Sequence, residues 1–280
     1  MLLLRLAGLT RFTDVEGYES LERGPHTVLI RPEWKGPLLE DLLEDFRGVT
    51  PSDRRLYAHG RATHFSYRPR GAPERVFVRI GVRGGLVGTL LGGLNFGIRR
   101  PVRELVAASA ARRAGVSVPE PLAVRATRVG GLFWRFTVVV REVQDASDLL
   151  ALAEGLTPTR KRDLIVRVAD EMRRLHDAGV YHADLTLKNI LLSGSDVYII
   201  DLDKATLTAR RTDALDVMNL SRLNRSVEKL LGGRGSVTRA DKLRFLRRYL
   251  GGRERVKELA RKCASGLGLH RLWWAFTGQA

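Results

Sequence analysis

The sequence predicts an α+β protein with a mostly β amino-terminal half and a mostly α carboxyl-terminal half. The chain has 280 residues, of which 44% are hydrophobic and 28% charged, so it can bury a full core and is neither disordered nor fibrous. Runs rich in β-branched and aromatic residues lie before residue 145, whereas amphipathic helical patterns follow it. This change of pattern predicts one lobe over residues 1–145 and a second over residues 146–280.

Two strands and one helix are predicted in the first half. The strands cover residues 75–80 and 132–140, where Val, Phe and Trp are frequent. Between them, residues 102–114 are rich in Ala and free of Gly and Pro, which predicts a helix ended by Gly115.

The second half is predicted to be helical around a small hairpin. Residues 159–178 repeat apolar side chains at helical spacing and end at Gly179; the repeated residues are Leu164, Val168, Met172 and Leu175. His176 lies on this apolar face, which favours a packed core histidine over a catalytic one. Two short strands follow at residues 190–192 and 197–200, and the remainder is helical and basic.

The charge balance indicates an anionic partner. The chain carries 48 Lys and Arg against 31 Asp and Glu, a net charge of +17, and residues 222–262 alone hold 14 basic and 4 acidic residues. These helices either present an ordinary solvated face or dock on anionic lipid head groups. The aromatic run Leu272–Phe276 likewise either packs on the helical lobe or anchors at a membrane interface. Nucleic-acid binding is disfavoured because no recognised module accompanies the charge.

The sequence also predicts the cellular compartment. The single Cys263 cannot form an internal disulfide, which favours a reducing compartment, and no His near it in sequence supports a catalytic thiol. The start, Met1–Leu6, lacks a basic region and is interrupted by Arg5, so it resembles neither a signal peptide nor a transmembrane span. We therefore expect a cytoplasmic protein.

The densest group of polar residues lies at residues 181–204. Phosphoryl transfer needs a carboxylate that orients the attacking hydroxyl and hard oxygen ligands that hold Mg²⁺ against the phosphates. Asp184 stands five residues before Asn189, and Asp201 ends the next strand. This spacing is typical of kinases, although His182, Asp184 and Asn189 could instead be turn and capping residues around a buried hairpin.

Several segments resemble the lipopolysaccharide kinase family of the protein-kinase-like superfamily, which includes the 3-deoxy-D-manno-octulosonic acid (Kdo) kinases. They span roughly residues 57–230 and comprise residues 83–86, 114–121, 182–192, 200–204 and 219–226. The resemblance implies a bilobal protein-kinase-like fold, with a small, mostly β lobe that binds ATP and a larger, mostly α lobe. Residues 1–55 would then form a family-specific extension.

The resemblance also implies roles for individual residues. Asp184 would be the catalytic base, and Asn189 and Asp201 would bind Mg²⁺. Arg79 stands where kinases carry a lysine for the ATP phosphates, and Glu104 is its natural partner. A guanidinium can bridge a carboxylate and a phosphate, but strand alternation could also place Arg79 on the surface.

Weaker signals concern the nucleotide and the acceptor. Gly60 and Thr63 fall in the turn expected to cover the phosphates, although that turn has only one glycine. Arg83, Gly84 and Gly85 form either a family-specific acceptor loop or an ordinary flexible turn. Asp203 and Lys204 are further candidates for substrate binding.

The implied activity is ATP-dependent phosphorylation of a Kdo hydroxyl on a lipid A precursor. The implied location is the cytoplasmic face of the bacterial inner membrane, with peripheral attachment, and the implied partners are a lipid-linked anionic sugar and an anionic membrane surface. Alternatives are a core heptose kinase, a protein or small-molecule kinase, or a catalytically inactive binding module. The oligomeric state stays open.

Overall fold

The computed structural model describes residues 15–59, 62–80, 95–96, 99–130, 133–153, 155–231, 237–252 and 256–263. Its contacts divide the chain into two compact units. The first comprises residues 1–109 and 119–143, and the second residues 110–118 and 144–280. The lobe boundary expected after residue 145 stays a prediction.

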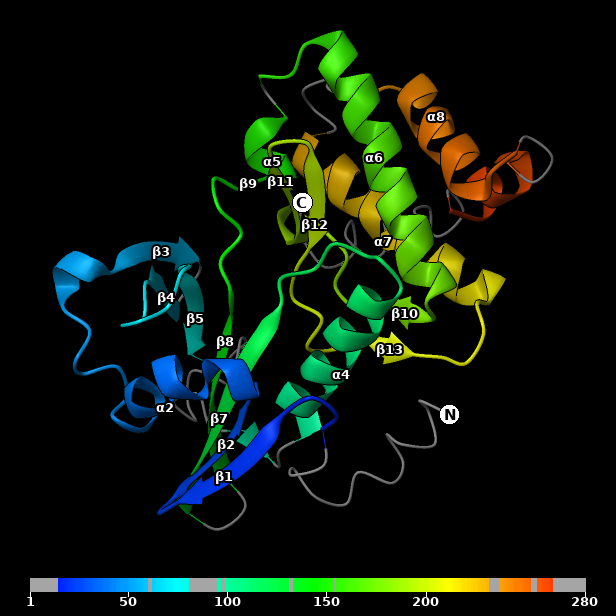
Figure 1. The fold of residues 1–280 in the computed structure, drawn as a ribbon. Coiled ribbons are helices and arrows are strands. Elements are labelled where there is room, and N and C mark those ends of the chain that lie inside the picture. Colours follow the sequence, from blue (N-terminus) through cyan, green and yellow to red (C-terminus); the bar gives the residue numbers. More distant parts are fainter. Residues whose placement is uncertain are drawn as a thin grey trace, which may run out of the picture. The chain divides into compact units, whose positions relative to one another are not determined.

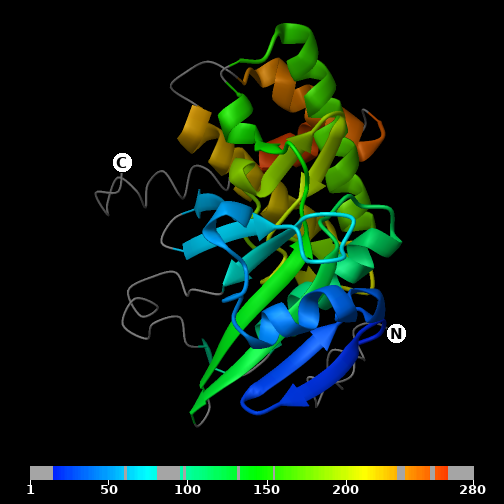
Figure 2. The same ribbon diagram turned by 60° about the vertical axis from the view of Figure 1, so that its left-hand side comes forward.

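An antiparallel sheet forms the centre of the first unit. Its main strands follow the spatial order β1-β2-β7-β8-β5-β4-β3, and β6 adds to β8. Figures 1 and 2 show β1 and β2 in blue beside the long green strands β7 and β8. The strands are β1 (Glu19–Arg23), β2 (His26–Ile30), β3 (Arg55–His59), β4 (Ala62–Tyr67), β5 (Val76–Ile80), β6 (Asn95–Phe96), β7 (Pro121–Gly130) and β8 (Phe133–Arg141).

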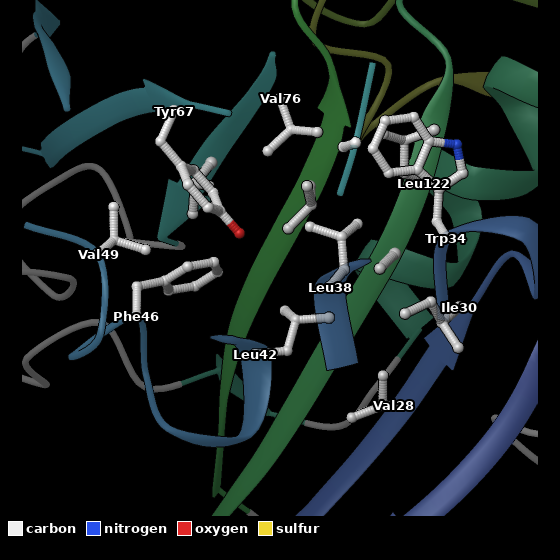
Figure 3. Close-up of a cluster of buried hydrophobic side chains, with 14 of the residues drawn as sticks. Val28, Ile30, Trp34, Leu38, Leu42, Phe46, Val49, Tyr67, Val76 and Leu122 are labelled. Carbon is white, nitrogen blue, oxygen red and sulfur yellow. The ribbon is translucent and has the colours of Figure 1, made fainter. Parts of the chain in front are cut away.

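Each face of this sheet is covered by one helix because strand side chains alternate between the faces. Val28 and Ile30 pack with Leu38 and Leu42 of α2 (Lys35–Leu43) in the cluster drawn in Figure 3. Leu29, between them, belongs to a second cluster with Val102 and Leu105 of α4 (Arg99–Arg113). The sheet is therefore buried on both sides, which holds β5 and α4 in a fixed setting.

The expectation of a single helix in the first half is wrong, because α2 is a second one. Gly36 and Pro37 weaken its sequence signal, although Pro is tolerated in a first turn whose N–H groups lack helical partners. The buried guanidinium of Arg125 on β7 donates to the carbonyl oxygen of Leu42 and to the carboxylate of Asp45, and so ties the end of α2 to the sheet.

The second unit is mostly helical, with α6 packed beside α8 (Figure 1). Its helices are α5 (Leu149–Leu152), α6 (Pro158–Asp177), α7 (Asp213–Leu231) and α8 (Arg239–Leu250), and residues 256–263 are also helical. Two small sheets join β10 (Val180–Tyr181) to β13 (Thr206–Leu207), and β12 (Asp196–Ile199) to β11 (Ile190–Ser193) and β9 (Ser147–Asp148). Short 3-10 turns are η1 (Pro32–Trp34), η2 (Pro51–Asp53) and η3 (Leu187–Asn189).

The structure confirms the remaining predicted elements. Strands β5 and β8, helices α4 and α6 and the hairpin β11-β12 lie where the patterns place them, and the four repeated apolar residues of α6 are buried. His176 is a core residue with no exposed surface; its Nδ1 lies 2.7 Å from the Tyr249 hydroxyl, and burial lowers its pKa to about 4. Cys263 is buried, and burial raises the pKa of its thiol.

The structure bears on one of the two sequence features considered in relation to a membrane, the presence of a spanning helix. Within the described residues, no helix is both long and apolar enough to cross a bilayer. The aromatic run Leu272–Phe276 lies outside the described residues.

Candidate functional site

The loop that carries Asp184 is held by the side chain of His182. This residue follows β10 and is almost fully buried. Its Nδ1 accepts a hydrogen bond from the backbone N–H of Asp184 at 2.9 Å, and its Nε2 lies 2.8 Å from the carbonyl oxygen of Ile200. An imidazole that accepts at Nδ1 and donates at Nε2 is neutral, in agreement with burial, which lowers the pKa of His182.

The same contacts bring the segment before Asp201 against the loop. The N–H of Ile200 donates to the carbonyl oxygen of Asn189 at 3.0 Å, while its carbonyl oxygen accepts from His182. Ile200 is thus held on both sides of its backbone. Asp201 comes next with φ of 65°, a left-handed conformation that is uncommon for a residue other than Gly. Such outliers are frequent at functional sites.

Asp184 and Asn189 close the loop between them. The amide nitrogen of Asn189 donates to the backbone carbonyl oxygen of Asp184 at 2.8 Å. This bond orients the amide and leaves its oxygen for another ligand. The carboxylate of Asp184 is exposed, as a group that meets a substrate hydroxyl must be.

Helix α7 holds the backbone of this loop through two side chains, a contact that the sequence did not predict. The Asn219 side-chain oxygen accepts from the N–H of His182 at 2.9 Å, and the Ser226 hydroxyl oxygen accepts from the N–H of Leu187 at 3.1 Å. Both residues are buried. Their spacing of seven residues, two helical turns, was the available signal, because it places both side chains on one side of a helix.

The donor set around Asn189 and Asp201 fits Mg²⁺. Mg²⁺ in nucleotide sites usually takes one or two protein oxygens together with substrate phosphates and water. Asp201 offers a carboxylate and Asn189 an amide oxygen, and backbone bonds through Ile200 hold the two residues together. Among the described residues, no group of three His, Cys, Asp or Glu could hold a metal ion by itself.

The candidate phosphate-binding pair lies in the first unit. Arg79 of β5 donates through Nη2 to both carboxylate oxygens of Glu104 on α4. Glu104 is buried and Arg79 is a quarter exposed. The pairing expected from sequence is therefore present, whereas the role of Arg79 toward phosphates stays a prediction.

The other predicted residues are placed as follows. Thr63 lies in β4, opposite Ala58 of β3, whereas Gly60, Arg83, Gly84 and Gly85 lie outside the described residues. Asp203 is buried and Lys204 is exposed, both just after Asp201. Their roles toward an acceptor stay predictions.

The fold and the loop define a protein of the kinase-like class, and the comparisons agree. A solved structure titled "WaaP in complex with acyl carrier protein" superposes with a TM-score of 0.59 at 22% identity, covering 86% of this chain and 95% of that one, which shows a shared fold. Residues 77–249, more than half of the chain, match the Lipopolysaccharide kinase (Kdo/WaaP) family. The chain belongs to this family.

Curated relatives in the family are 3-deoxy-D-manno-octulosonic acid kinases. The protein from Vibrio cholerae is 35% identical over 49% of this chain and 56% of its own length. That from Photobacterium profundum is 38% identical over 43% and 49%, and that from Haemophilus influenzae is 33% identical over 42% and 50%. The matched region thus spans about half the length of these relatives.

The contact between Arg79 and Glu104 generates a first prediction. Each single change, Arg79→Ala or Glu104→Ala, should raise the KM for ATP and lower kcat, with kcat/KM falling about tenfold to a hundredfold, because charge-assisted bonds are lost. The double variant should lose much less than the product of the two single losses, since both changes disrupt one unit. Arg79→Lys should recover only part of the activity, because an ammonium cannot act as a fork.

Steady-state kinetics with ATP varied checks this prediction. Arg162→Ala, at an exposed α6 arginine, is the matched control and should behave as wild type. Additive losses, or normal activity of Arg79→Ala, would mean that another group holds the phosphates.

Proposed function

We propose that this chain is an ATP-dependent kinase that phosphorylates a Kdo hydroxyl of a lipid A precursor. The observation that carries the proposal is the loop of residues 182–189, in which an exposed carboxylate is fixed two residues after a buried neutral histidine. Membership of the Kdo/WaaP family and relatives named Kdo kinase support the choice of substrate.

The proposed reaction is an in-line displacement at the γ-phosphorus of ATP. The acceptor hydroxyl oxygen forms a bond to phosphorus, the bond from phosphorus to the β,γ-bridging oxygen breaks, and ADP leaves. Asp184 orients the hydroxyl and takes its proton, a role that requires the exposure this carboxylate has. The bond from Asn189 to the Asp184 carbonyl oxygen keeps the loop in position during this transfer.

We propose that three pairs of residues bind the nucleotide. Asn189 and Asp201 would hold Mg²⁺, which when bound neutralises charge on the phosphates. Arg79 would contact a phosphate while Glu104 fixes its guanidinium. Gly60 and Thr63 would cover the phosphates, and Arg83, Gly84, Gly85, Asp203 and Lys204 would line the acceptor.

We further place the protein at the cytoplasmic face of the bacterial inner membrane, attached peripherally. The support is the basic stretch at residues 222–262, because polyanionic lipid A and anionic lipids attract such surfaces. A core heptose, a protein or a small molecule are the alternative acceptors, and an inactive binding module is the alternative to catalysis. The presence of Asp184, Asn189 and Asp201 in the order expected of a kinase argues against an inactive module.

A large apolar cavity in the second unit supports an acyl carrier protein as a further partner. Its volume is about 720 Å³, within the range of small-ligand sites. The walls are mostly aliphatic, including Leu164, Leu220, Leu223 and Leu246, and cations lie among the lining residues, namely Lys161, Arg239, Lys242, Lys257 and Arg261. This combination suits an acyl chain whose carrier presents anionic groups, and the WaaP structure with the shared fold is titled as a complex with acyl carrier protein.

Asp184→Asn should lower phosphoryl transfer a hundredfold or more while nucleotide affinity stays within severalfold of wild type, because the carboxylate meets the acceptor and not the nucleotide. The assay is transfer from radiolabelled ATP to Kdo-lipid A, heptosylated lipid A and a generic protein. The control is Asp163→Asn on the exposed side of α6.

The acceptor panel separates the alternatives. Transfer to Kdo-lipid A alone supports the proposal, and transfer to another acceptor selects the corresponding alternative. Wild-type protein that transfers to none is an inactive module. A variant that keeps most of its turnover would remove Asp184 from catalysis.

Asp201→Ala should weaken binding of Mg²⁺-ATP at least tenfold and leave binding of Mg²⁺-free ATP nearly unchanged, since this carboxylate would reach the nucleotide through the metal. Calorimetric titrations with and without Mg²⁺ measure the two affinities, with Asp163→Ala as control. Equal losses in both titrations would contradict the metal role.

Ala260→Phe should weaken binding of an acylated acyl carrier protein about tenfold or more, because Ala260 lines the cavity and a ring there would occupy the space of the chain. Calorimetry compares acylated and unacylated carrier, and the control is Ala214→Phe at an exposed position of α7. Equal affinity of wild type for both carriers would contradict the role of the cavity.

A further inference from the structure

A basic stripe on α7 borders the loop that carries Asp184. Asn219 and Ser226 of this helix hold the loop backbone. Arg222 is three residues after Asn219 and four before Ser226, so the helix places all three side chains on one side. Arg225 lies one turn beyond Arg222. Both arginines are partly buried, and Met218 on the same stripe is 41% exposed, so the stripe also meets solvent.

Among the residues that the structure describes, these two arginines lack the acidic partners that other partly buried arginines have. Arg75 pairs with Glu142, Arg31 with Glu120 and Arg211 with Asp216. Within the described part of the chain, neither Arg222 nor Arg225 makes an ion pair or a side-chain hydrogen bond. Two partly desolvated guanidinium groups without an anion are an unfavourable arrangement, because each removes charge from water without compensation.

The two charges also act on each other. Burial and, after it, the positive charge of Arg222 lower the pKa of Arg225. A guanidinium stays charged near neutral pH, so this repulsion is relieved by an anion and not by loss of a proton. Neighbouring planar forks suit the oxygens of a carboxylate or a phosphate, each of which can accept two parallel hydrogen bonds.

We propose that Arg222 and Arg225 form an anion-binding subsite that holds a carboxylate or phosphate of the acceptor while its hydroxyl meets Asp184. The inference rests on the proposed function and deepens it. The subsite explains why a helix that positions the loop also carries two unpaired cations beside it. A lipid-linked acidic sugar offers both kinds of oxyanion, one on the sugar and one on the lipid.

The test is steady-state kinetics in detergent with the acceptor varied. Arg222→Gln and Arg225→Gln should each raise the KM for the acceptor about tenfold or more, the loss expected when a charge-assisted bond is removed, while the KM for ATP stays unchanged. Arg222→Lys should recover only part of the affinity, because it keeps the charge and loses the fork. Arg162→Gln removes one positive charge from α6, outside the basic stretch at residues 222–262, and is the matched control.

Modified acceptors then identify the anion. One arm uses an acceptor with its sugar carboxylate esterified, and the other an acceptor without lipid phosphates. With the acceptor that lacks the bound group, the acceptor KM of wild type should rise about as much as Arg222→Gln raises it with the intact acceptor. Arg222→Gln tested on that modified acceptor should show little further rise.

The outcomes separate this inference from the proposed function. Wild type that transfers to no Kdo acceptor overturns the proposed function. Wild type that transfers, with arginine variants of unchanged acceptor KM, overturns the subsite alone. The subsite is also overturned if the rise in acceptor KM caused by Arg222→Gln multiplies with the rise caused by each of the two modified acceptors. An equal rise in the KM for ATP would overturn it too, since both results indicate a general structural effect.

Discussion

The candidate site depends on the neutral imidazole of His182, buried between two segments of chain. One ring nitrogen accepts from the N–H of Asp184, and the other faces the carbonyl oxygen of Ile200, next to Asp201. A protonated ring would lose the bond to the Asp184 N–H, because it has no lone pair left at Nδ1. Burial keeps the ring neutral, so one side chain sets the positions of both candidate carboxylates.

Helix α7 extends this constraint into the core of the second unit. It contacts the loop through Asn219 and Ser226, and its first turn carries the buried Asp216. Asp216 accepts from the Tyr181 hydroxyl at 3.1 Å and from Nε of Arg211 at 2.8 Å. Tyr181 directly precedes His182, so the loop is anchored on both sides by one helix. The basic stripe of α7, with Arg222 and Arg225, lies on the same helix that anchors the loop.

The first unit holds a charged pair between an interior strand of its sheet, β5, and helix α4. Glu104 lies on α4, whose apolar residues pack on one sheet face, while Arg79 projects from β5. The Glu104 carboxylate is largely removed from water. Removal of one partner of such a pair leaves the other charge buried without compensation. The guanidinium is more exposed than the carboxylate, as the proposed contact of Arg79 with a phosphate requires.

Local patterns by themselves determined much of this protein. Helical and alternating periodicities located α4, α6, β5, β8 and the β11-β12 hairpin, since each depends on burial of one face. The spacing of Asp184, Asn189 and Asp201 was readable because the loop, hairpin and following turn are contiguous in sequence. The pairing of Arg79 with Glu104 was expected only through resemblance to a family.

Tertiary structure decided the rest. Helix α2 is short and has an early Gly-Pro pair, and it is stabilised by a sheet face and by Arg125, more than 80 residues away. The spacing of Asn219 and Ser226 indicates only that both lie on one side of a helix, whereas their hydrogen bonds to the loop span 37 and 39 residues and depend on the fold. That Arg222 and Arg225 have no partner among the described residues is likewise a property of the folded chain, because only packing determines which charges form pairs.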